Sequence, residues 1–183
     1  KETISLTINP KEPFRFDFKL RMPAWVKHPK IFINKKATSI KAAPGSYAVI
    51  SRVWQAGDTI ELALPMPIER IYSHKLVTSN TACVALKRGP LVYCIEQADF
   101  GKSDVFNILL PAGAQLTATH VPKLLNGVTI ISGSAICKES NSTVLYAGVG
   151  KKAAATKVRF TAIPYYAWAN RIRGKMRVWI PEC

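Results

Sequence analysis

The pattern that most constrains this chain is the alternation of apolar and polar side chains with a period of two residues. In FRFDFKL, residues 14–20, every second residue is phenylalanine or leucine and the residues between them are charged. Because successive side chains of a strand point to opposite faces of a sheet, this segment predicts a strand with one buried and one hydrated face.

Similar short segments recur along the whole chain, separated by Gly, Pro, Asn and Asp turns, and no apolar stripe with helical spacing is present. The pattern predicts an all-β chain with little or no helix, built as a sandwich or jelly roll. Composition changes around residues 65–80 and 100–113 indicate connections between two packed sheet pairs. The predicted strands are residues 2–8, 14–20, 30–34, 46–54, 58–64, 68–73, 82–88, 91–96, 115–121, 127–133, 142–148, 156–163 and 175–180.

The net charge of +15 and the pI of about 9.9 raise the question of nucleic-acid binding. Most cations alternate with apolar residues, as on the hydrated side of a sheet, and aromatic and basic residues mostly occupy separate segments, so nucleic acid is not the expected partner. The exceptions are Arg171, Arg173, Lys175 and Arg177, whose spacing would place four cations on one face of a strand. Four like charges in a row repel one another unless acidic groups lie against them, and we expect another protein surface to supply those groups.

Motifs that carry chemistry are scarce. Cys83, Cys94, Cys137 and Cys183 form no C-x-x-C pair, and His28, His74 and His120 are isolated, so no metal site is predicted. Residues 82–96 predict a hairpin with Arg88-Gly89 at its tip and Cys83 opposite Cys94, and we favour two buried free thiols over a strained disulfide. Glu61, Glu69, Glu96 and Asp99 are the carboxylates that a glycosidase would need in pairs, although solvated surface acids are the commoner case. Asn141-Ser142-Thr143 is a glycosylation sequon, which has meaning only in a secreted eukaryotic protein.

Residues 164–171, PYYAWANR, are too rich in aromatic residues for a linker. Pro164 should end the preceding strand, and Asn170 and Arg171 should hydrogen-bond turn carbonyls in the irregular segment that follows. We expect Trp168 to be mainly buried, with a sugar-stacking surface as the alternative. The aromatic residues that a carbohydrate-binding module would use are Trp25, Trp54, Tyr165, Tyr166, Trp168 and Trp179.

Four segments in a fixed order resemble the C-terminal region of glycoside hydrolase family 127, the β-L-arabinofuranosidase group. The resemblance runs from about residue 20 to the end, and the W-A-N-R and R-G-P-L-V-Y phrases are its most specific parts. The dipeptide Asn34-Lys35 departs from the Asn-Gly turn of the family, so a looser hairpin is expected there. The segments are LRMPAW (20–25), SYAVISRVWQAGDTIELALPM (46–66), VALKRGPLVYCIEQAD (84–99) and IPYYAWANRIRGKMRVWIP (163–181).

This resemblance implies that catalysis belongs to a preceding (α/α)6 barrel with a cysteine nucleophile in a zinc site. None of the four cysteines here matches that motif, so the resemblance implies neither a catalytic residue nor a cofactor in this chain, with zinc expected only in the barrel. It also implies two packed antiparallel β-sandwiches: residues 1–78, completed by a returning C-terminal strand within 168–183, and residues 79–167.

The function expected from the resemblance is that of a non-catalytic accessory region of a bacterial glycoside hydrolase. It would brace the barrel of the same polypeptide, and dimer contacts or the rim of the substrate pocket are further expected roles. The alternative is a carbohydrate-binding module, and the residues expected to contact carbohydrate or the barrel are Trp25, Trp54, Tyr165, Tyr166, Trp168, Asn170 and Arg171. No run is long and apolar enough for a membrane span. The sequence begins with Lys1 and shows no signal-peptide pattern, so we expect a cut or processed N-terminus. The compartment, whether cytoplasmic, periplasmic or secreted, is therefore left open.

Overall fold

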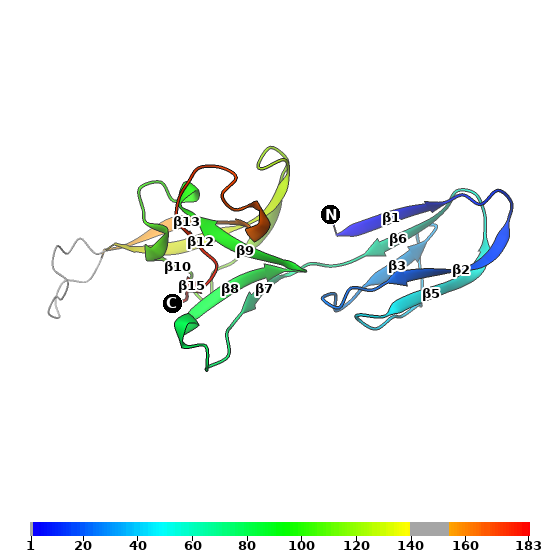
Figure 1. Cartoon of the computed structure of the whole chain (residues 1–183), viewed down its shortest axis with the longest axis horizontal. Coiled ribbons are helices and arrows are strands. Elements are labelled where there is room, and N and C mark those ends of the chain that lie inside the picture. The colour runs from blue at the N-terminus through cyan, green and yellow to red at the C-terminus, as the bar shows by residue number, and fades with distance from the viewer. Residues whose placement is uncertain (1, 140–153) are drawn as a thin grey trace. The chain divides into compact units, whose positions relative to one another are not determined.

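The computed structural model describes residues 2–139 and 154–183, and its chain divides into two compact units, residues 1–67 and 68–183 (Figure 1). Each unit is built from antiparallel strands, which confirms the all-β prediction. The only helices in the described ranges are 3-10 turns of three residues, Thr78–Asn80, Gln97–Asp99, Val105–Asn107 and Tyr165–Ala167. The strand predicted at 142–148 and the sequon at Asn141 lie outside the described residues.

The first unit is a small sandwich of two sheets. One sheet has the strand order β1-β6-β3-β4, and the other consists of β2 and β5. The period-two pattern of residues 14–20 becomes β2, whose residues pair with β5 from Phe14 opposite Trp54 to Arg21 opposite Tyr47. The strands are β1 (Thr3–Ile8), β2 (Phe14–Arg21), β3 (Lys30–Ile33), β4 (Lys36–Ala37), β5 (Tyr47–Trp54) and β6 (Asp58–Ala63).

Both sheets of the first unit contribute to one core. Trp54 lies fully buried in it, and its ring centroid is 5.9 Å from that of Phe16 and 6.0 Å from that of Phe18. The indole N–H donates to the backbone oxygen of Phe16 at 3.1 Å, as a buried indole requires. Met22 and Ile60 are also fully buried there. Trp54 therefore fills the core of the sandwich and is not exposed for contact with a ligand.

The turn between β3 and β4 is held by side-chain contacts. Asn34 and Lys35 both have positive φ, 49° and 65°, which suits a two-residue hairpin turn that usually contains glycine. The Asn34 amide donates to Asp58 Oδ1 at 2.7 Å and accepts from the backbone N–H of Thr59 at 2.7 Å. The hydrogen bond from Asn34 lowers the pKa of Asp58 below its usual value, with a further one from the backbone N–H of Gln55. The turn is thus anchored to β6 although it lacks glycine.

The second unit forms one path of paired strands with the order β10-β12-β13-β9-β8-β15, and β7, β11 and β14 pair with members of this path. Its main core contains Leu86, Tyr93, Ile131 and Phe160, all fully buried. A smaller cluster includes Cys94, Ile163 and Ala167. The strands are β7 (Ile68–Ile71), β8 (Cys83–Arg88), β9 (Leu91–Glu96), β10 (Ile108–Leu109), β11 (Thr117–Val121), β12 (Val128–Glu139), β13 (Ala154–Pro164), β14 (Met176–Arg177) and β15 (Ile180–Pro181).

The C-terminal segment belongs to the second unit, which corrects the expectation that residues 168–183 complete the first sandwich. Strand β14 pairs with β9, Met176 opposite Glu96, and β15 pairs with β8, Ile180 opposite Val84. Ile180 is buried in the main core of this unit, so apolar burial selects the pairing. The boundary between the units also lies earlier than the predicted residue 78, because β7 pairs with β8.

The hairpin of β8 and β9 differs from its predicted register. Lys87 lies opposite Val92 and Arg88 opposite Leu91, so Gly89-Pro90 forms the tip in place of Arg88-Gly89. In this register Cys83 and Cys94 are not opposite each other. In the other strand pairs, Cys94 lies opposite Ile163 of β13 and Cys83 opposite Pro181 of β15. None of the four cysteines forms a disulfide bond; Cys94 and Cys137 are buried, and Cys83 is only partly buried.

Candidate functional site

Of the residues expected to contact carbohydrate or the barrel, five lie in one loop of the second unit, residues 164–171, called here the aromatic loop. Trp54 and Trp25 lie in the first unit, Trp54 fully buried and Trp25 packed against its core. Trp179 is partly buried in the second unit. The aromatic loop is thus the place where the predicted residues come together.

The aromatic loop presents its rings to solvent. The exposed fraction is 47% for Tyr165, 65% for Tyr166 and 39% for Trp168. The expectation that Trp168 is mainly buried is therefore wrong. The physical reason lies in the backbone: Pro164 ends β13 and a single 3-10 turn follows, in which Ala167 is the buried residue and packs into the smaller cluster.

Tyr165 and Trp168 form a pair of nearly parallel rings. Their centroids are 6.1 Å apart and the angle between the ring planes is 17°. Offset stacking of this kind is a favourable arrangement of two aromatic rings. The two rings therefore stabilise each other's position, and both side chains stay partly exposed to solvent.

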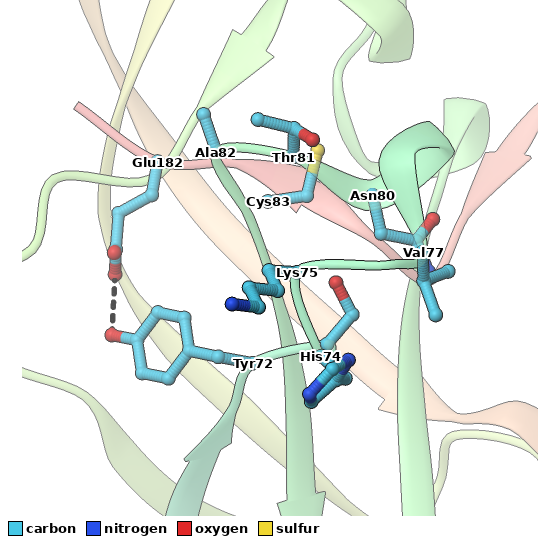
Figure 2. Close-up of a pocket in the computed structure, with 10 residues that line it drawn as sticks. Tyr72, His74, Lys75, Val77, Asn80, Thr81, Ala82, Cys83 and Glu182 are labelled. Carbon is cyan, nitrogen blue, oxygen red and sulfur yellow. Dashed lines mark hydrogen bonds between the residues drawn. The ribbon is translucent and has the colours of Figure 1, made fainter.

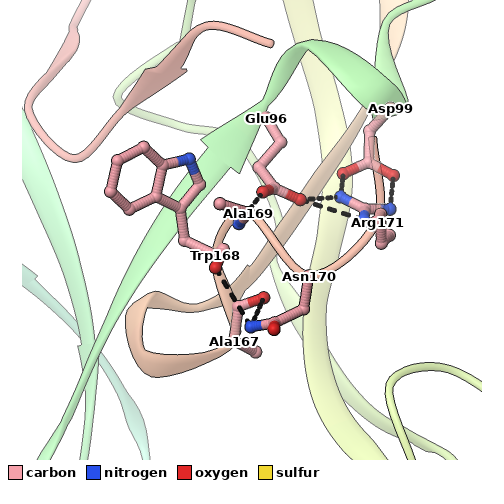
Figure 3. Close-up of polar contacts among 7 residues, drawn as sticks. All are labelled: Glu96, Asp99, Ala167, Trp168, Ala169, Asn170 and Arg171. Atoms are coloured by element: carbon pink, nitrogen blue, oxygen red, sulfur yellow. Dashed lines mark hydrogen bonds and ion pairs between the residues drawn. The ribbon is translucent and has the colours of Figure 1, made fainter. Parts of the chain in front are cut away.

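An ion cluster of Arg171, Glu96 and Asp99, which we call the Arg171 clamp, holds the loop in place (Figure 3). Arg171 donates to Glu96 Oε2 through Nε at 2.9 Å, and to Asp99 through both terminal nitrogens at 2.8 and 2.7 Å. Its Nη2 also donates to Glu96. Glu96 ends β9 and Asp99 belongs to the 3-10 turn after it, so the clamp ties the aromatic loop to the strand that pairs with β13.

The loop backbone is fixed by the same groups. Ala169 has a φ of 62°, in the left-handed region, and its N–H donates to Glu96 Oε1 at 2.9 Å. The Asn170 amide donates to the backbone oxygens of Ala167 and Trp168 at 3.3 and 3.1 Å. The prediction that Asn170 bonds turn carbonyls is confirmed, whereas Arg171 binds carboxylates instead.

The Arg171 clamp is largely shielded from water. Exposed side-chain fractions are 18% for Arg171, 5% for Glu96 and 15% for Asp99. Hydrogen bonds to Asp99, followed by those to Glu96, raise the pKa of Arg171 above its usual value and outweigh the opposite effect of burial. Two of the four candidate glycosidase carboxylates, Glu96 and Asp99, are thus bound to a permanent cation.

Two of the four cations in the predicted row, Arg171 and Lys175, pair with acids of the same chain. Lys175 pairs with Asp104, and Arg177 donates to the backbone oxygen of Phe106 at 2.9 Å while both cations lie over the Phe106 ring. Arg173 is exposed, so an acidic partner surface stays a prediction. Residues 168–175 form no strand.

A pocket of about 330 Å³ lies in the second unit beside the connection from β7 to β8 (Figure 2). Tyr72 donates to Glu182 Oε1 at 3.1 Å across one side of it, and the same oxygen accepts from Arg70 at 2.5 Å. No sequence motif marked this pocket, since its walls come from residues 72–83 and from the chain end. Its lining includes His74, Lys75 and Cys83.

The remaining predicted groups do not gather. In the part of the chain that the structure describes, no three His, Cys, Asp or Glu side chains lie close enough to hold a metal ion. Glu69 lies 3.8 Å from Lys87 in an ion pair between β7 and β8. No helix among the described residues is long and apolar enough to cross a membrane.

Comparisons with known proteins match both units. The model of the "Glycoside hydrolase family 127 C-terminal domain" covers residues 68–181, and that of the middle domain of family 127 beta-L-arabinofuranosidase covers residues 1–66. The chain is 31% identical over 169 residues to a non-reducing end beta-L-arabinofuranosidase of Bifidobacterium longum subsp. longum, of which it spans 25%.

Solved structures give the same result over the full chain. A family 127 beta-L-arabinofuranosidase from Geobacillus stearothermophilus T6 is 40% identical with a TM-score of 0.85, and the chain spans 29% of it. A family 127 beta-arabinofuranosidase is 31% identical with a TM-score of 0.83, and the chain spans 30% of it. From its two units and these matches, the chain belongs to glycoside hydrolase family 127, of which it represents the middle and C-terminal domains.

Proposed function

We propose that residues 1–183 are the non-catalytic C-terminal region of a longer enzyme that acts on β-L-arabinofuranosides, and that they brace a catalytic barrel lying outside this sequence. The observation that carries the proposal is coverage: the whole chain matches only 29% and 30% of two solved beta-arabinofuranosidases. The bulk of each relative therefore lies in parts that this sequence does not contain.

The chemistry of the cysteines supports this division. A cysteine that binds zinc or acts as a nucleophile does so as the thiolate. Burial raises the pKa of Cys94 to about 12, which disfavours its thiolate. Cys83 lies opposite Pro181 and Cys94 opposite Ile163. We assign the nucleophile and zinc that the family resemblance implies to the proposed barrel.

The connection from β7 to β8 offers a surface that the barrel would cover. Leu76 is 79% exposed, and Ile71, Tyr72 and Val77 are exposed beside it in the sequence. Contiguous exposed apolar side chains of this kind commonly mark a contact with another part of a protein. Docking of the barrel there would remove them from water and stabilise both parts.

Activity separates this function from that of an independent enzyme. We expect the 183-residue chain to show no turnover of an aryl β-L-arabinofuranoside, with or without zinc, and the longer polypeptide to be active. Turnover by the 183-residue chain that survives repurification and is lost on changing one carboxylate would contradict the proposal.

A second experiment tests the brace. In the longer polypeptide, Leu76→Asp should lower the melting temperature of the barrel, because it places a charge in the proposed contact. The matched control is Ile172→Asp, a 66% exposed apolar residue of the same unit outside that connection, which should leave the barrel unchanged. Equal behaviour of the two variants would argue against a contact at Leu76.

The alternative, a carbohydrate-binding module, is favoured by one observation. Three of its six candidate aromatic residues, Trp25, Trp54 and Trp179, are buried or partly buried, but Tyr165, Tyr166 and Trp168 form an exposed group. The alternative therefore has a single location, the aromatic loop. Dimer contacts and a contribution to the rim of the substrate pocket stay predictions.

A further inference from the structure

We propose that the Tyr165–Trp168 ring pair, with Tyr166 beside it, is a sugar-binding surface whose ligand is a neutral pentofuranosyl residue. The choice of an arabinofuranosyl ligand rests on the proposed function, whereas the existence of the surface rests on geometry. Sugar rings carry apolar C–H faces, and these pack against exposed aromatic rings. Tyr165 and Trp168 stack on each other with their planes inclined by 17°, and each ring keeps an exposed part that is available for such packing.

The rings are held on a rigid support before any ligand arrives. The Arg171 clamp ties the loop to β9, and Glu96 also holds the left-handed Ala169 that follows Trp168. Asn170 fixes the carbonyls of Ala167 and Trp168. Binding therefore orders little additional chain, and preorganised aromatic surfaces gain affinity for that reason.

The polar tips of the three side chains are available to a ligand. Among the described contacts, neither phenol hydroxyl of Tyr165 and Tyr166 nor the indole N–H of Trp168 takes part in a hydrogen bond. A sugar hydroxyl both donates and accepts, so it can pair with each of these groups. Aromatic surface combined with a few unpaired polar groups is the usual composition of a small-molecule site.

The charge of the Arg171 clamp favours a neutral ligand. Glu96 and Asp99 carry two negative charges against the single positive charge of Arg171, so the clamp offers no attraction to phosphate. Nucleic-acid sites that stack bases on aromatic rings place them beside a positive groove. Here the guanidinium is already bound to two carboxylates.

The test follows the indole N–H signals of the 183-residue chain by NMR during titration with methyl β-L-arabinofuranoside. The chain has four tryptophans, and the signal missing from Trp168→Phe identifies that of Trp168. We expect this signal to move saturably with the sugar, while the signal of the fully buried Trp54 stays in place. Titration with methyl β-D-glucopyranoside compares a pyranose, and tighter binding of that sugar would overturn the pentofuranosyl assignment.

Variants link the shift to the surface. Trp168→Ala should weaken binding about tenfold or more, equivalent to about 1.4 kcal/mol, and Phe14→Ala in the first unit, an exposed aromatic control, should bind as the unchanged chain does. Tyr165→Ala serves as a second variant should Trp168→Ala fail to give a folded spectrum.

Two results would overturn the proposal. One is a Trp168 signal that does not move at any sugar concentration. The other is a Trp168 that is protected from acrylamide quenching in the longer polypeptide, because the loop would then be a contact with the barrel. Neither result bears on the activity assay or on the Leu76→Asp experiment, so the proposed function can stand or fall separately.

Discussion

Replacing Arg171, a side chain close to the surface of the second unit, by alanine should strongly lower the free energy of unfolding of that unit. The substitution would leave the Glu96 and Asp99 carboxylates close together, with side chains only 5% and 15% exposed. Removing one partner of a buried ion pair costs about 3–5 kcal/mol. Because all three groups keep some contact with water, we expect about 2–4 kcal/mol, which for a unit of this size lowers the melting temperature by about 8–16 °C.

Urea unfolding with hydrogen exchange of residues 91–96 would locate the loss in the second unit. Arg173→Ala is the matched control, since Arg173 is an exposed cation of the same segment and its loss should change stability by less than about 0.5 kcal/mol. Arg171→Met combined with Glu96→Gln and Asp99→Asn should recover most of the stability, because no unpaired charge remains. If Arg171→Ala unfolds within about 0.5 kcal/mol of the unchanged chain, the clamp does not support the loop and the reasoning fails.

Trp54, which is fully buried, and Trp168, which is 39% exposed, should lose different amounts of stability when replaced by alanine. In urea unfolding, Trp54→Ala should lower the free energy of unfolding by about 3–5 kcal/mol and Trp168→Ala by less than about 1 kcal/mol. Equal losses would contradict their different burial. Lys35→Gly should stabilise the first unit by about 1 kcal/mol in the same measurement, because glycine adopts a φ of 65° without strain. Iodoacetamide at pH 8 should label exposed Cys183 well before Cys94, whose pKa is raised to about 12, as peptide mass spectrometry would show; rapid labelling of Cys94 in the folded chain would speak against its burial.

The fold was predictable where the controlling pattern is local. Strands β2 and β5 lie where the alternation placed them, because the side-chain period of a strand is a property of neighbouring residues. The hairpin tip was misplaced by one residue, since Arg88-Gly89 and Gly89-Pro90 are both acceptable turns and only the packed sheet selects between them.

Long-range partners were out of reach of the sequence. The spacing of Arg171 and its neighbouring cations imitates a strand, but the partner that decides its conformation, Glu96, lies 75 residues away. The aromatic loop was recognised as a candidate site, yet the exposure of Trp168 depends on which residue of a single 3-10 turn faces the core. The pocket near Tyr72 could not be predicted from the sequence, because Glu182, which closes one side of it, lies 110 residues from Tyr72.

The late position of β14 and β15 has a consequence for how the protein is made. Every strand of the first unit finds its described partner within residues 1–67, so that unit can fold as soon as these residues leave the ribosome. The second unit must wait, because Ile180 enters its core only when residues 176–181 have been translated. Until then the nascent chain carries an incomplete apolar core, and a ribosome stalled shortly before residue 176 would hold a folded first unit beside an open second one.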